Sequence, residues 1–415
     1  MRVSIQTLGC KVNFAEMQDL ADRLGRAGVD VREDHPDPDV CVINSCTVTA
    51  QADRKVRTLV HGIRRRHPQA HVVLTGCHVD NPHPRASARD AADIVFPNQR
   101  KREIFEYLMA STSPVSGSLP PDSSGARAFG RSRYFLKVQD GCNHRCTYCI
   151  VWRTRGSSIS EAESDLLERA QAAVQAGYGE IVLTGVDLGS YGRERQSSLA
   201  DFLTRLLNTV APARLRLSSI NANDIGPALI DLLGAPGICR HLHIPLQSGS
   251  DRVLKRMGRL YRSGDYLRLV GALRARIPDL ALTTDVIVGF PGETADDFAQ
   301  TQTLAREAGF SGMHVFRYSP RAGTAAPRLG RPADDPVARA RSSALQAQAE
   351  AQRRMYEARF IDRDLDVVWD RSFDHRMRGL SDTYITVFAP RRGQMLGALE
   401  TVHALAASDS GLLVG

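Results

Sequence analysis

The first 110 residues alternate between short strand-like segments and longer segments whose hydrophobic positions have a helical period. Strands are predicted at residues 2–7, 40–43, 71–74 and 94–96, and helices at residues 13–27 and 50–66. Strands that alternate with helices are typical of a parallel sheet covered by helices. We therefore expect an N-terminal α/β domain over residues 1–110.

A run rich in Ser, Pro and Gly follows at residues 111–128, and its composition predicts a linker. Beyond it, strand-like and helical segments alternate again. The predicted strands are residues 134–138, 180–183, 215–218, 241–244, 281–288 and 312–318, and the predicted helices are 161–176, 199–210, 225–233, 264–276 and 294–307. This repetition predicts an open (β/α)6 partial barrel over residues 129–335, with its chemistry at the carboxyl ends of the strands.

The end of the chain has a third pattern. Residues 336–360 predict a long polar helix that connects two domains, and residues 365–414 alternate in short strand-like stretches. Short strands of this kind predict a small β-barrel over residues 361–415. The expected fold class is α/β, with a parallel N-terminal domain, a central partial barrel and a C-terminal β-barrel.

Composition narrows the class of protein. Of 415 residues, 42% are hydrophobic, yet no stretch is long and apolar enough for a membrane span, and the start has no secretory signal. We therefore expect a cytoplasmic protein without membrane contact. The net charge of +8 and the pI of about 9.2 are compatible with a polyanionic partner such as RNA, and equally with an arginine-rich composition alone.

Three cysteines, Cys142, Cys146 and Cys149, form a CxxxCxxC motif just after the first predicted barrel strand. Three thiolates on one loop can hold three irons of a [4Fe–4S] cluster and leave the fourth iron open, and that iron can chelate S-adenosylmethionine for radical chemistry. The alternatives are a structural cluster and a zinc knuckle with His144 as the fourth ligand. We favour radical chemistry because the motif lies at the end of a barrel strand.

Three further cysteines, Cys10, Cys46 and Cys77, are far apart in the sequence, but each follows a predicted strand of the N-terminal domain. Parallel strands place their carboxyl ends at one edge of a sheet, so these cysteines can converge. We expect a second cluster site there; the alternative is three unrelated cysteines.

Taken together, the motifs resemble those of the radical S-adenosylmethionine methylthiotransferases over nearly the whole chain. The matching segments are GCNHRCTYCI at 141–150, IVLTGVDLGSYG at 181–192, HIPLQSGS at 243–250, TDVIVGFPGET at 284–294 and FRYSPRAGT at 316–324. Within that family, TLGCKVN at 7–13 and NSCTVT at 44–49 resemble the branch that acts on N6-threonylcarbamoyladenosine in tRNA. Other branches have different residues after the first cysteine.

This resemblance implies two [4Fe–4S] clusters, S-adenosylmethionine and a C-terminal TRAM-like barrel. It further implies that a cluster on Cys10, Cys46 and Cys77 would carry or donate the sulfur, that one S-adenosylmethionine would methylate this sulfur, and that another would give the radical that removes hydrogen from C2 of the adenine. The implied product is the 2-methylthio base at tRNA position 37. The implied partners are tRNA and a flavodoxin- or ferredoxin-like electron donor, with the enzyme a monomer. The alternatives are an isopentenyladenosine tRNA or ribosomal-protein substrate, and a noncatalytic iron–sulfur RNA-binding protein.

Further residues at strand ends are candidates for contacts with S-adenosylmethionine or substrate, although packing or a tight turn explains each equally well. They are Tyr148, Thr184, Gly185, Ser219, Gln247, Asp285 and Gly289. Three positions depart from the family pattern near the expected substrate face: Trp152, Ile159 and Asn221. Basic clusters that can contact RNA phosphates lie at residues 64–66, 100–102 and 391–392, with Arg376 and Arg378 nearby.

Overall fold

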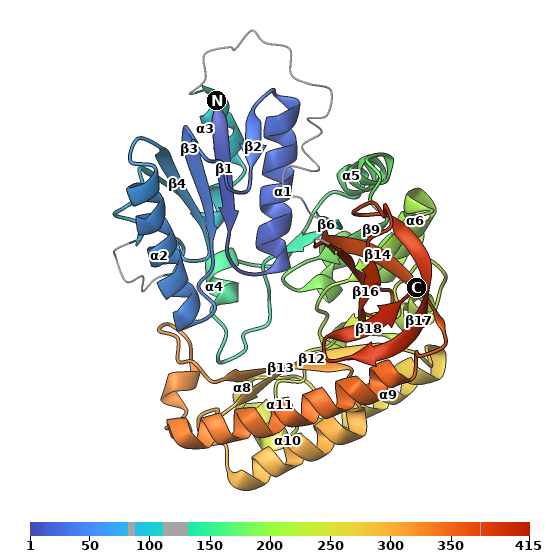
Figure 1. Ribbon diagram of the computed structural model, residues 1–415. Coiled ribbons are helices and arrows are strands. Elements are labelled where there is room, and N and C mark those ends of the chain that lie inside the picture. Colours follow the sequence, from blue (N-terminus) through green and yellow to red (C-terminus); the bar gives the residue numbers. More distant parts are fainter. Residues whose placement is uncertain (82–87, 111–131, 374) are drawn as a thin grey trace.

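The computed structural model describes residues 1–81, 88–110, 132–373 and 375–415 (Figure 1). The predicted linker at 111–128 lies outside the described residues. No helix in the described part of the chain is both long enough and apolar enough to cross a membrane. How the chain divides into separate domains stays a prediction.

The N-terminal sheet is parallel, with its five strands in the order β2-β1-β3-β4-β5. The strands are β1 (Arg2–Thr7), β2 (Asp30–Arg32), β3 (Val40–Ser45), β4 (His71–Gly76) and β5 (Ile94–Phe96). Helices α1 (Lys11–Arg26) and α3 (Glu103–Ala110) pack on one face, and α2 (Ala50–Arg66) packs on the other. The prediction is confirmed here, although β2 and α3 were not predicted because each is short.

The central part contains two parallel three-stranded sheets that continue into one another. The first has the order β10-β9-β6 and the second β11-β12-β13, and a bridge between Ser219 and His243 joins them. Their bounds are β6 (Tyr134–Lys137), β9 (Glu180–Thr184), β10 (Arg214–Leu217), β11 (His241–His243), β12 (Ala281–Val288) and β13 (Gly312–Arg317). The six strands therefore form the predicted open partial barrel.

Helices cover the outer face of this barrel and bury the main hydrophobic core against it. They are α5 (Glu163–Gln175), α6 (Leu199–Val210), α7 (Pro227–Leu233), α9 (Ser263–Arg276) and α10 (Ala295–Ala308). Four short elements were not predicted: β7 (Gln139–Asp140) and its partner strand β8 (Ile159–Ser160), α4 (Val151–Arg155) and α8 (Asp251–Met257). Alternate residues of each barrel strand face inward, and these inner positions define the concave face.

Helix α11 (Asp335–Ala358) runs along the central barrel and leads to a closed barrel of five strands, consistent with a TRAM-like module. Its strands are β14 (Asp364–Ser372), β15 (Arg376–Ser381), β16 (Thr386–Pro390), β17 (Leu399–Ser408) and β18 (Gly411–Val414). Alternate residues of these strands, with Trp369 at the centre, fill the interior. The sequence prediction of a small β-barrel is thus confirmed.

The small barrel packs against the amino ends of β9, β10 and β11. Glu180 lies 2.7 Å from both Arg214 and Arg216, and all three side chains are buried. The arginines also donate to main-chain carbonyls of the small barrel, at distances of 2.6 to 3.2 Å. Tyr384 stacks on His241, with ring centroids 3.8 Å apart and planes 6° from parallel.

Candidate functional site

The CxxxCxxC cysteines lie on the loop between β7 and α4. Main-chain hydrogen bonds fold this loop, with the Cys142 amide 3.0 Å from the Gly156 carbonyl and the Cys149 amide 3.1 Å from the Cys146 carbonyl. Burial, then the charges of Asp187 and the two other cysteines, raise the pKa of Cys142 to about 12. The main-chain bonds therefore hold the three thiols on one folded loop.

The other three cysteines converge as well, at the carboxyl ends of β1, β3 and β4. A side chain at Gly9, whose φ is +116°, would lie 3.2 Å from the Cys46 sulfur, so Cys46 abuts the backbone just before Cys10. The Cys77 amide donates to the Ser45 carbonyl at 3.0 Å. Burial raises the pKa of Cys46 to about 11, and the charges of Cys77 and Cys10 add to the shift.

One short helix, α4, connects the two cysteine sets. It starts at Val151, two residues after Cys149, and the Val151 amide donates to the Cys149 sulfur at 3.4 Å. Near its end, the Thr154 carbonyl accepts at 2.9 Å from Asn98, and the same Asn98 amide group lies 3.8 Å from the Cys77 sulfur. Helix α4 therefore contacts one set of thiols directly, through Cys149, and the other through Asn98 and Cys77.

A buried network of charges surrounds this connection. Arg155, whose side chain is 1% exposed, lies 2.9 Å from Glu16 and 2.8 Å from Asp140. Lys101 and Lys137 approach Glu16 to 2.5 and 2.9 Å. Burial alone would raise the pKa of Glu16, but the three cations hold it well below its usual value. Three cations against two carboxylates leave one excess positive charge beside the N-terminal cysteines.

A second polar chain leads away from the barrel cysteines. Arg259 lies 3.6 Å from the Cys146 sulfur and 3.0 Å from the Asn221 side-chain oxygen, and Asn221 in turn donates to Asp187 at 2.8 Å. His144 points to the same carboxylate, with its Nε2 atom 3.5 Å from Asp187. Since this imidazole is engaged by carboxylates, it does not favour the zinc-knuckle alternative.

The three departures from the family pattern lie in different surroundings. Asn221 is part of the hydrogen-bonded network that reaches Cys146. Ile159, by contrast, is 62% exposed, so this departure lies at the surface. Trp152 has the Arg153 guanidinium 4.6 Å and the Arg145 guanidinium 5.6 Å from its ring centroid. Of the three, Asn221 is therefore the one that alters contacts close to the barrel cysteines.

Two of the predicted cofactor contacts lie near one another beyond the cysteine loop. The ring of Tyr148 packs edge-on against Phe290, with centroids 6.4 Å apart. Gly289, just before Phe290, has φ of +73° and donates its amide to Glu293 at 2.6 Å. This places an aromatic surface and a left-handed glycine at the carboxyl end of β12, while their roles in cofactor binding stay predictions.

The remaining predicted contacts follow the inner face and strand ends of the barrel. Thr184 ends β9 and is buried, and a side chain at Gly185 would approach Gln139 to 2.9 Å. Ser219 forms the bridge that joins the two sheets, and Gln247 holds a left-handed conformation, with φ of +64°, where its backbone pairs with β12. Each of these positions is constrained by its backbone or its burial, and a role in cofactor binding stays a prediction.

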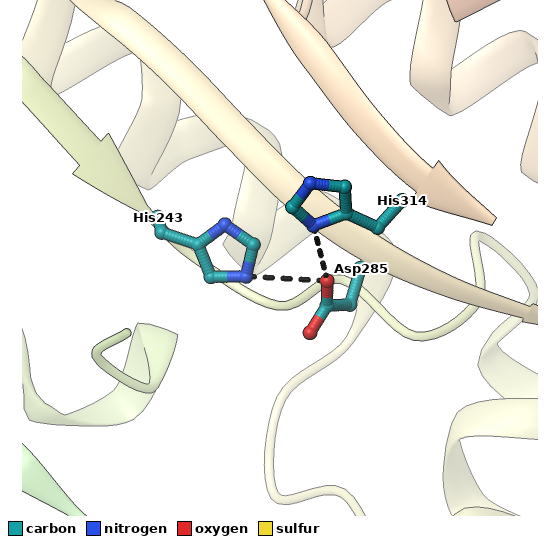
Figure 2. Close-up of side chains that lie close together, drawn as sticks. All are labelled: His243, Asp285 and His314. Atoms are coloured by element: carbon teal, nitrogen blue, oxygen red, sulfur yellow. Dashed lines mark hydrogen bonds and ion pairs between the residues drawn. The ribbon is translucent and has the colours of Figure 1, made fainter. Parts of the chain in front are cut away.

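Asp285 lies on the concave face between two histidines (Figure 2). Its Oδ1 atom is 3.3 Å from His243 Nε2 and 3.1 Å from His314 Nδ1. Burial would raise the pKa of Asp285, but the two histidines hold it far below its usual value. The hydrogen bond to Asp285 in turn raises the pKa of His314. Neither histidine was predicted to be functional, and only their position on neighbouring strands brings them together.

The N-terminal domain and the partial barrel are also joined near Cys46 and Cys77. Arg321, from the segment after β13, lies 2.8 Å from Asp53 and binds the side-chain oxygen of Thr47 at 2.7 Å. His78, which is 1% exposed, lies 3.0 Å from the same carboxylate. This contact fixes the residues after Cys46 against the barrel.

The predicted basic clusters differ in how their charges are used. Arg64 binds Asp93 at 2.7 Å, Arg100 binds Glu103 at 2.6 Å, and Arg102 binds Glu161. In contrast, four cations on the outer side of α2 form no ion pair with any described residue: Arg54, Lys55, Arg57 and Arg65. Three of them, the arginines, line one surface hollow of about 480 Å³. We call these four residues the α2 cation strip.

The donor sets fit iron–sulfur clusters. In each set two thiols have a raised pKa, Cys10 and Cys46 in one and Cys142 and Cys149 in the other, so these thiols ionise readily only when a metal binds them. The excess positive charge near Arg155 and the Arg259 guanidinium beside Cys146 both favour anionic sulfur. Within the described residues, neither set has a fourth protein ligand in place.

Two family models match the chain: the Radical SAM superfamily over residues 136–305, and the Uncharacterized protein family UPF0004 over residues 2–97. The first match contains the CxxxCxxC loop and most of the open barrel. The chain is therefore a radical S-adenosylmethionine enzyme, a class that uses a [4Fe–4S] cluster and S-adenosylmethionine.

Sequence relatives show to which family of radical S-adenosylmethionine enzymes the chain belongs. The Threonylcarbamoyladenosine tRNA methylthiotransferase MtaB of Thermotoga maritima is 36% identical over 99% of this chain and 96% of its own length. The protein of that name in Bacillus subtilis is 34% identical over 98% of this chain and 94% of its own. The tRNA-2-methylthio-N(6)-dimethylallyladenosine synthase of Cereibacter sphaeroides is 31% identical over 100% and 94%. The chain belongs to the radical S-adenosylmethionine tRNA methylthiotransferase family.

Among solved structures, the radical S-adenosylmethionine methyltransferase TsrM from Kitasatospora setae has a TM-score of 0.54 at 15% identity. The match covers 77% of this chain and 73% of TsrM. At that identity the likeness concerns the fold alone, and it agrees with the partial barrel described above.

Proposed function

We propose that this enzyme converts N6-threonylcarbamoyladenosine at tRNA position 37 to its 2-methylthio derivative, using two [4Fe–4S] clusters and two molecules of S-adenosylmethionine. The observation that carries the proposal is that two three-thiol sets meet at α4, one through Cys149 and the other through Asn98 and Cys77. A single radical centre needs only one such set. The second set provides a place where sulfur can be held beside the reacting base.

The bound clusters and S-adenosylmethionine would supply the radical that removes hydrogen from C2 of the adenine and the methylated sulfur that replaces it. The chain's own residues hold the two thiol sets in fixed relation. Arg155, Lys101 and Lys137 compensate negative charge on the N-terminal side, and Arg259 does so beside Cys146. Burial of these groups excludes water, which strengthens each electrostatic interaction.

One observation supports the choice of the modified base, and a second supports an RNA substrate. The relatives named for threonylcarbamoyladenosine in Thermotoga maritima and Bacillus subtilis are 34–36% identical, whereas the one named for dimethylallyladenosine in Cereibacter sphaeroides is 31% identical. The α2 cation strip begins soon after Cys46 and has no protein counter-charge in the described chain, as expected for a surface that meets RNA phosphates. Arg391 and Arg392 offer a second such contact on the small barrel.

The proposal includes a one-electron donor of flavodoxin or ferredoxin type, because radical formation consumes an electron. It also places the enzyme in the cytoplasm, where tRNA is modified, as a monomer. A dimethylallyladenosine tRNA or a ribosomal protein as substrate, and a noncatalytic RNA-binding role, are the competing outcomes of the experiments below.

Measurement of the iron content tests whether the protein binds two clusters. Anaerobically reconstituted wild-type protein should hold about eight irons per chain, since each [4Fe–4S] unit contains four. Replacement of Cys10, Cys46 and Cys77 by Ala, or of Cys142, Cys146 and Cys149 by Ala, should each leave about four. The two-cluster proposal would be wrong if the wild type held four irons and the variant without Cys142, Cys146 and Cys149 held none.

Nucleoside mass spectrometry tests the substrate. A deletion strain should lose only the methylthio group from the threonylcarbamoyl base, and the wild-type gene should restore it while either triple variant should not. Loss of the methylthio group from isopentenyladenosine instead, or an unchanged tRNA profile, would refute this substrate. Formation of 5′-deoxyadenosine by the reduced protein separates an enzyme from a noncatalytic RNA-binding protein.

A further inference from the structure

Three side chains that can ligate a metal ion meet on the concave face of the barrel (Figure 2). His243 ends β11, Asp285 lies in β12 and His314 lies in β13, and these three strands are neighbours in one sheet. Asp285 lies opposite His314 in the parallel register. His243 lies opposite Thr283, two residues before Asp285. Because residues two apart in a strand share a face, the register brings all three side chains to one face of the sheet.

The distances between these side chains match those between ligands of one small ion. Asp285 Oδ1 is 3.3 Å from His243 Nε2 and 3.1 Å from His314 Nδ1. One ligand atom from each of the three residues lies within 4.8 Å of the other two. A zinc ion with bonds of about 2.1 Å holds neighbouring ligand atoms about 3.0 Å apart at right angles and about 3.4 Å apart at tetrahedral angles. The two observed distances lie between these values, so an ion fits with little movement of the side chains.

The second ring nitrogen of His243 has a partner of its own, as metal-bound histidines usually do. Its Nδ1 atom is 3.0 Å from the Thr283 hydroxyl oxygen, which is also 2.9 Å from His241 Nε2 and 3.4 Å from the Leu242 carbonyl. A hydroxyl can accept two hydrogen bonds and donate one, so Thr283 can accept from both rings and donate to the carbonyl. In that arrangement His243 carries its hydrogen on Nδ1 and presents the lone pair of Nε2 to an ion.

The cluster is open to solvent on one side. The exposed fraction of the side chain rises from 12% for His243 through 28% for Asp285 to 65% for His314. An ion can therefore reach the three ligand atoms past His314. Three protein ligands also leave a fourth coordination position for water or substrate, as in catalytic zinc sites and unlike closed structural ones.

The ligand types determine which cations fit. Imidazole nitrogen favours Zn²⁺, Fe²⁺ and other divalent transition metals, whereas Mg²⁺ and Ca²⁺ prefer sites made of oxygen ligands. The group contains two imidazoles, one carboxylate and no thiol, so its chemistry differs from that of both cysteine sets.

We propose that His243, Asp285 and His314 form a binding site for a divalent transition-metal ion, in addition to the two cysteine sets. The open coordination position of this ion takes an oxygen ligand, from water or from a substrate group that enters the barrel. The inference goes beyond the proposed function, and it depends neither on the modified base nor on the number of clusters.

Zinc is the probe in the first test. Anaerobically reconstituted full-length protein is dialysed against buffers of fixed free zinc concentration, and zinc and iron are measured in the same samples. The wild type should bind about one zinc per chain without loss of iron. Asp285→Asn and His314→Gln should each weaken zinc binding at least about tenfold at unchanged iron content. The matched control is His403→Gln, which removes a histidine 2.9 Å from Asp364 on the small barrel and should bind zinc as the wild type does.

X-ray absorption at the zinc edge then identifies the ligands. Zinc at the proposed site should have only nitrogen and oxygen neighbours, at about 2.0–2.1 Å, whereas zinc on cysteines has sulfur neighbours at about 2.3 Å. The inference would be wrong if the wild type bound no zinc or if its zinc neighbours were sulfur. It would also be wrong if Asp285→Asn and His314→Gln both bound zinc as tightly as the wild type, since hydrogen bonds alone would then explain the cluster.

Discussion

Arg155 holds Glu16 with both ends of its guanidinium group, with Nη1 2.9 Å from Oε1 and Nη2 3.3 Å from Oε2. The two residues come from different parts of the fold, since Glu16 lies on α1 and Arg155 ends α4. Each also has other partners, so their removal affects the whole buried network between the thiol sets.

Glu16→Gln is expected to destabilise the protein strongly. It leaves Arg155, Lys101 and Lys137 buried with only Asp140 as counter-charge in the described network, and such a change typically costs about 3–5 kcal/mol. Anaerobic urea unfolding of the metal-free protein measures the change. Glu103→Gln, which breaks the exposed pair with Arg100, should cost less than about 1 kcal/mol. Equal effects of the two variants would contradict the argument.

Glu180→Gln is expected to loosen the small barrel from the central one. Arg214 and Arg216 would then be buried without a carboxylate, with a cost of about 3–5 kcal/mol. The chain has two tryptophans, so Trp369 fluorescence in a Trp152→Phe background reports on unfolding of the small barrel. The partly exposed Glu163→Gln, paired with Arg205, serves as the comparison. If the unfolding transition reported by Trp369 were the same in Glu180→Gln as in the Trp152→Phe parent, the contacts of Glu180 would not be needed to hold the small barrel.

Asp22 is expected to make stability fall as the pH rises. It is 6% exposed, and burial, aided by the charge of Asp19, raises its pKa from 3.8 to about 7. Between these values the folded chain keeps a proton that the unfolded chain has released. Stability should therefore decrease from about pH 4 to pH 7, by up to about 4 kcal/mol.

Asp22→Asn should remove that decrease, so that the variant is more stable than the wild type at pH 8. Unfolding free energies measured from pH 4 to 8 provide the check. Asp409→Asn, at a side chain that is 97% exposed, should leave the profile unchanged. A wild-type profile that rises over this range, or an Asp22→Asn profile with the same slope, would contradict the assignment.

The α2 cation strip is expected to contribute to RNA affinity by binding phosphates. Replacement of Arg54, Arg57 and Arg65 by Gln should weaken binding of all RNAs alike and reduce the salt dependence by about one unit of slope for each phosphate that is no longer bound. The measurement is the dissociation constant over a series of salt concentrations. Arg64→Gln, at an arginine already bound to Asp93, should leave the slope unchanged. A strip variant with the wild-type slope would exclude this role.

Much of the architecture was predictable because its signals are local. The periods of hydrophobic residues placed the long strands and helices within a few positions, and the residues after β1, β3 and β4 indicated that Cys10, Cys46 and Cys77 meet. Parallel strands end at one edge of a sheet, so a shared position after a strand is a spatial prediction.

The charged surroundings of the thiols were not predictable in the same way. Arg155 binds Glu16, 139 residues away, and Lys101 reaches the same carboxylate from a third segment. Such contacts depend on how the N-terminal domain packs against the partial barrel. This packing cannot be predicted from a local sequence pattern. The same holds for Asp285, whose two histidine partners become visible only when β11, β12 and β13 are aligned in register.

Tyr384 stacks on His241, and Arg214 and Arg216 bind Glu180. Together these contacts hold the small barrel in a fixed position on the central barrel. If tRNA binds the outer surface of the small barrel, as the proposed function implies, the bound segment lies at a fixed distance from the concave face. In that arrangement the distance of a nucleotide from the bound segment, as well as its chemistry, would decide whether it reaches the site.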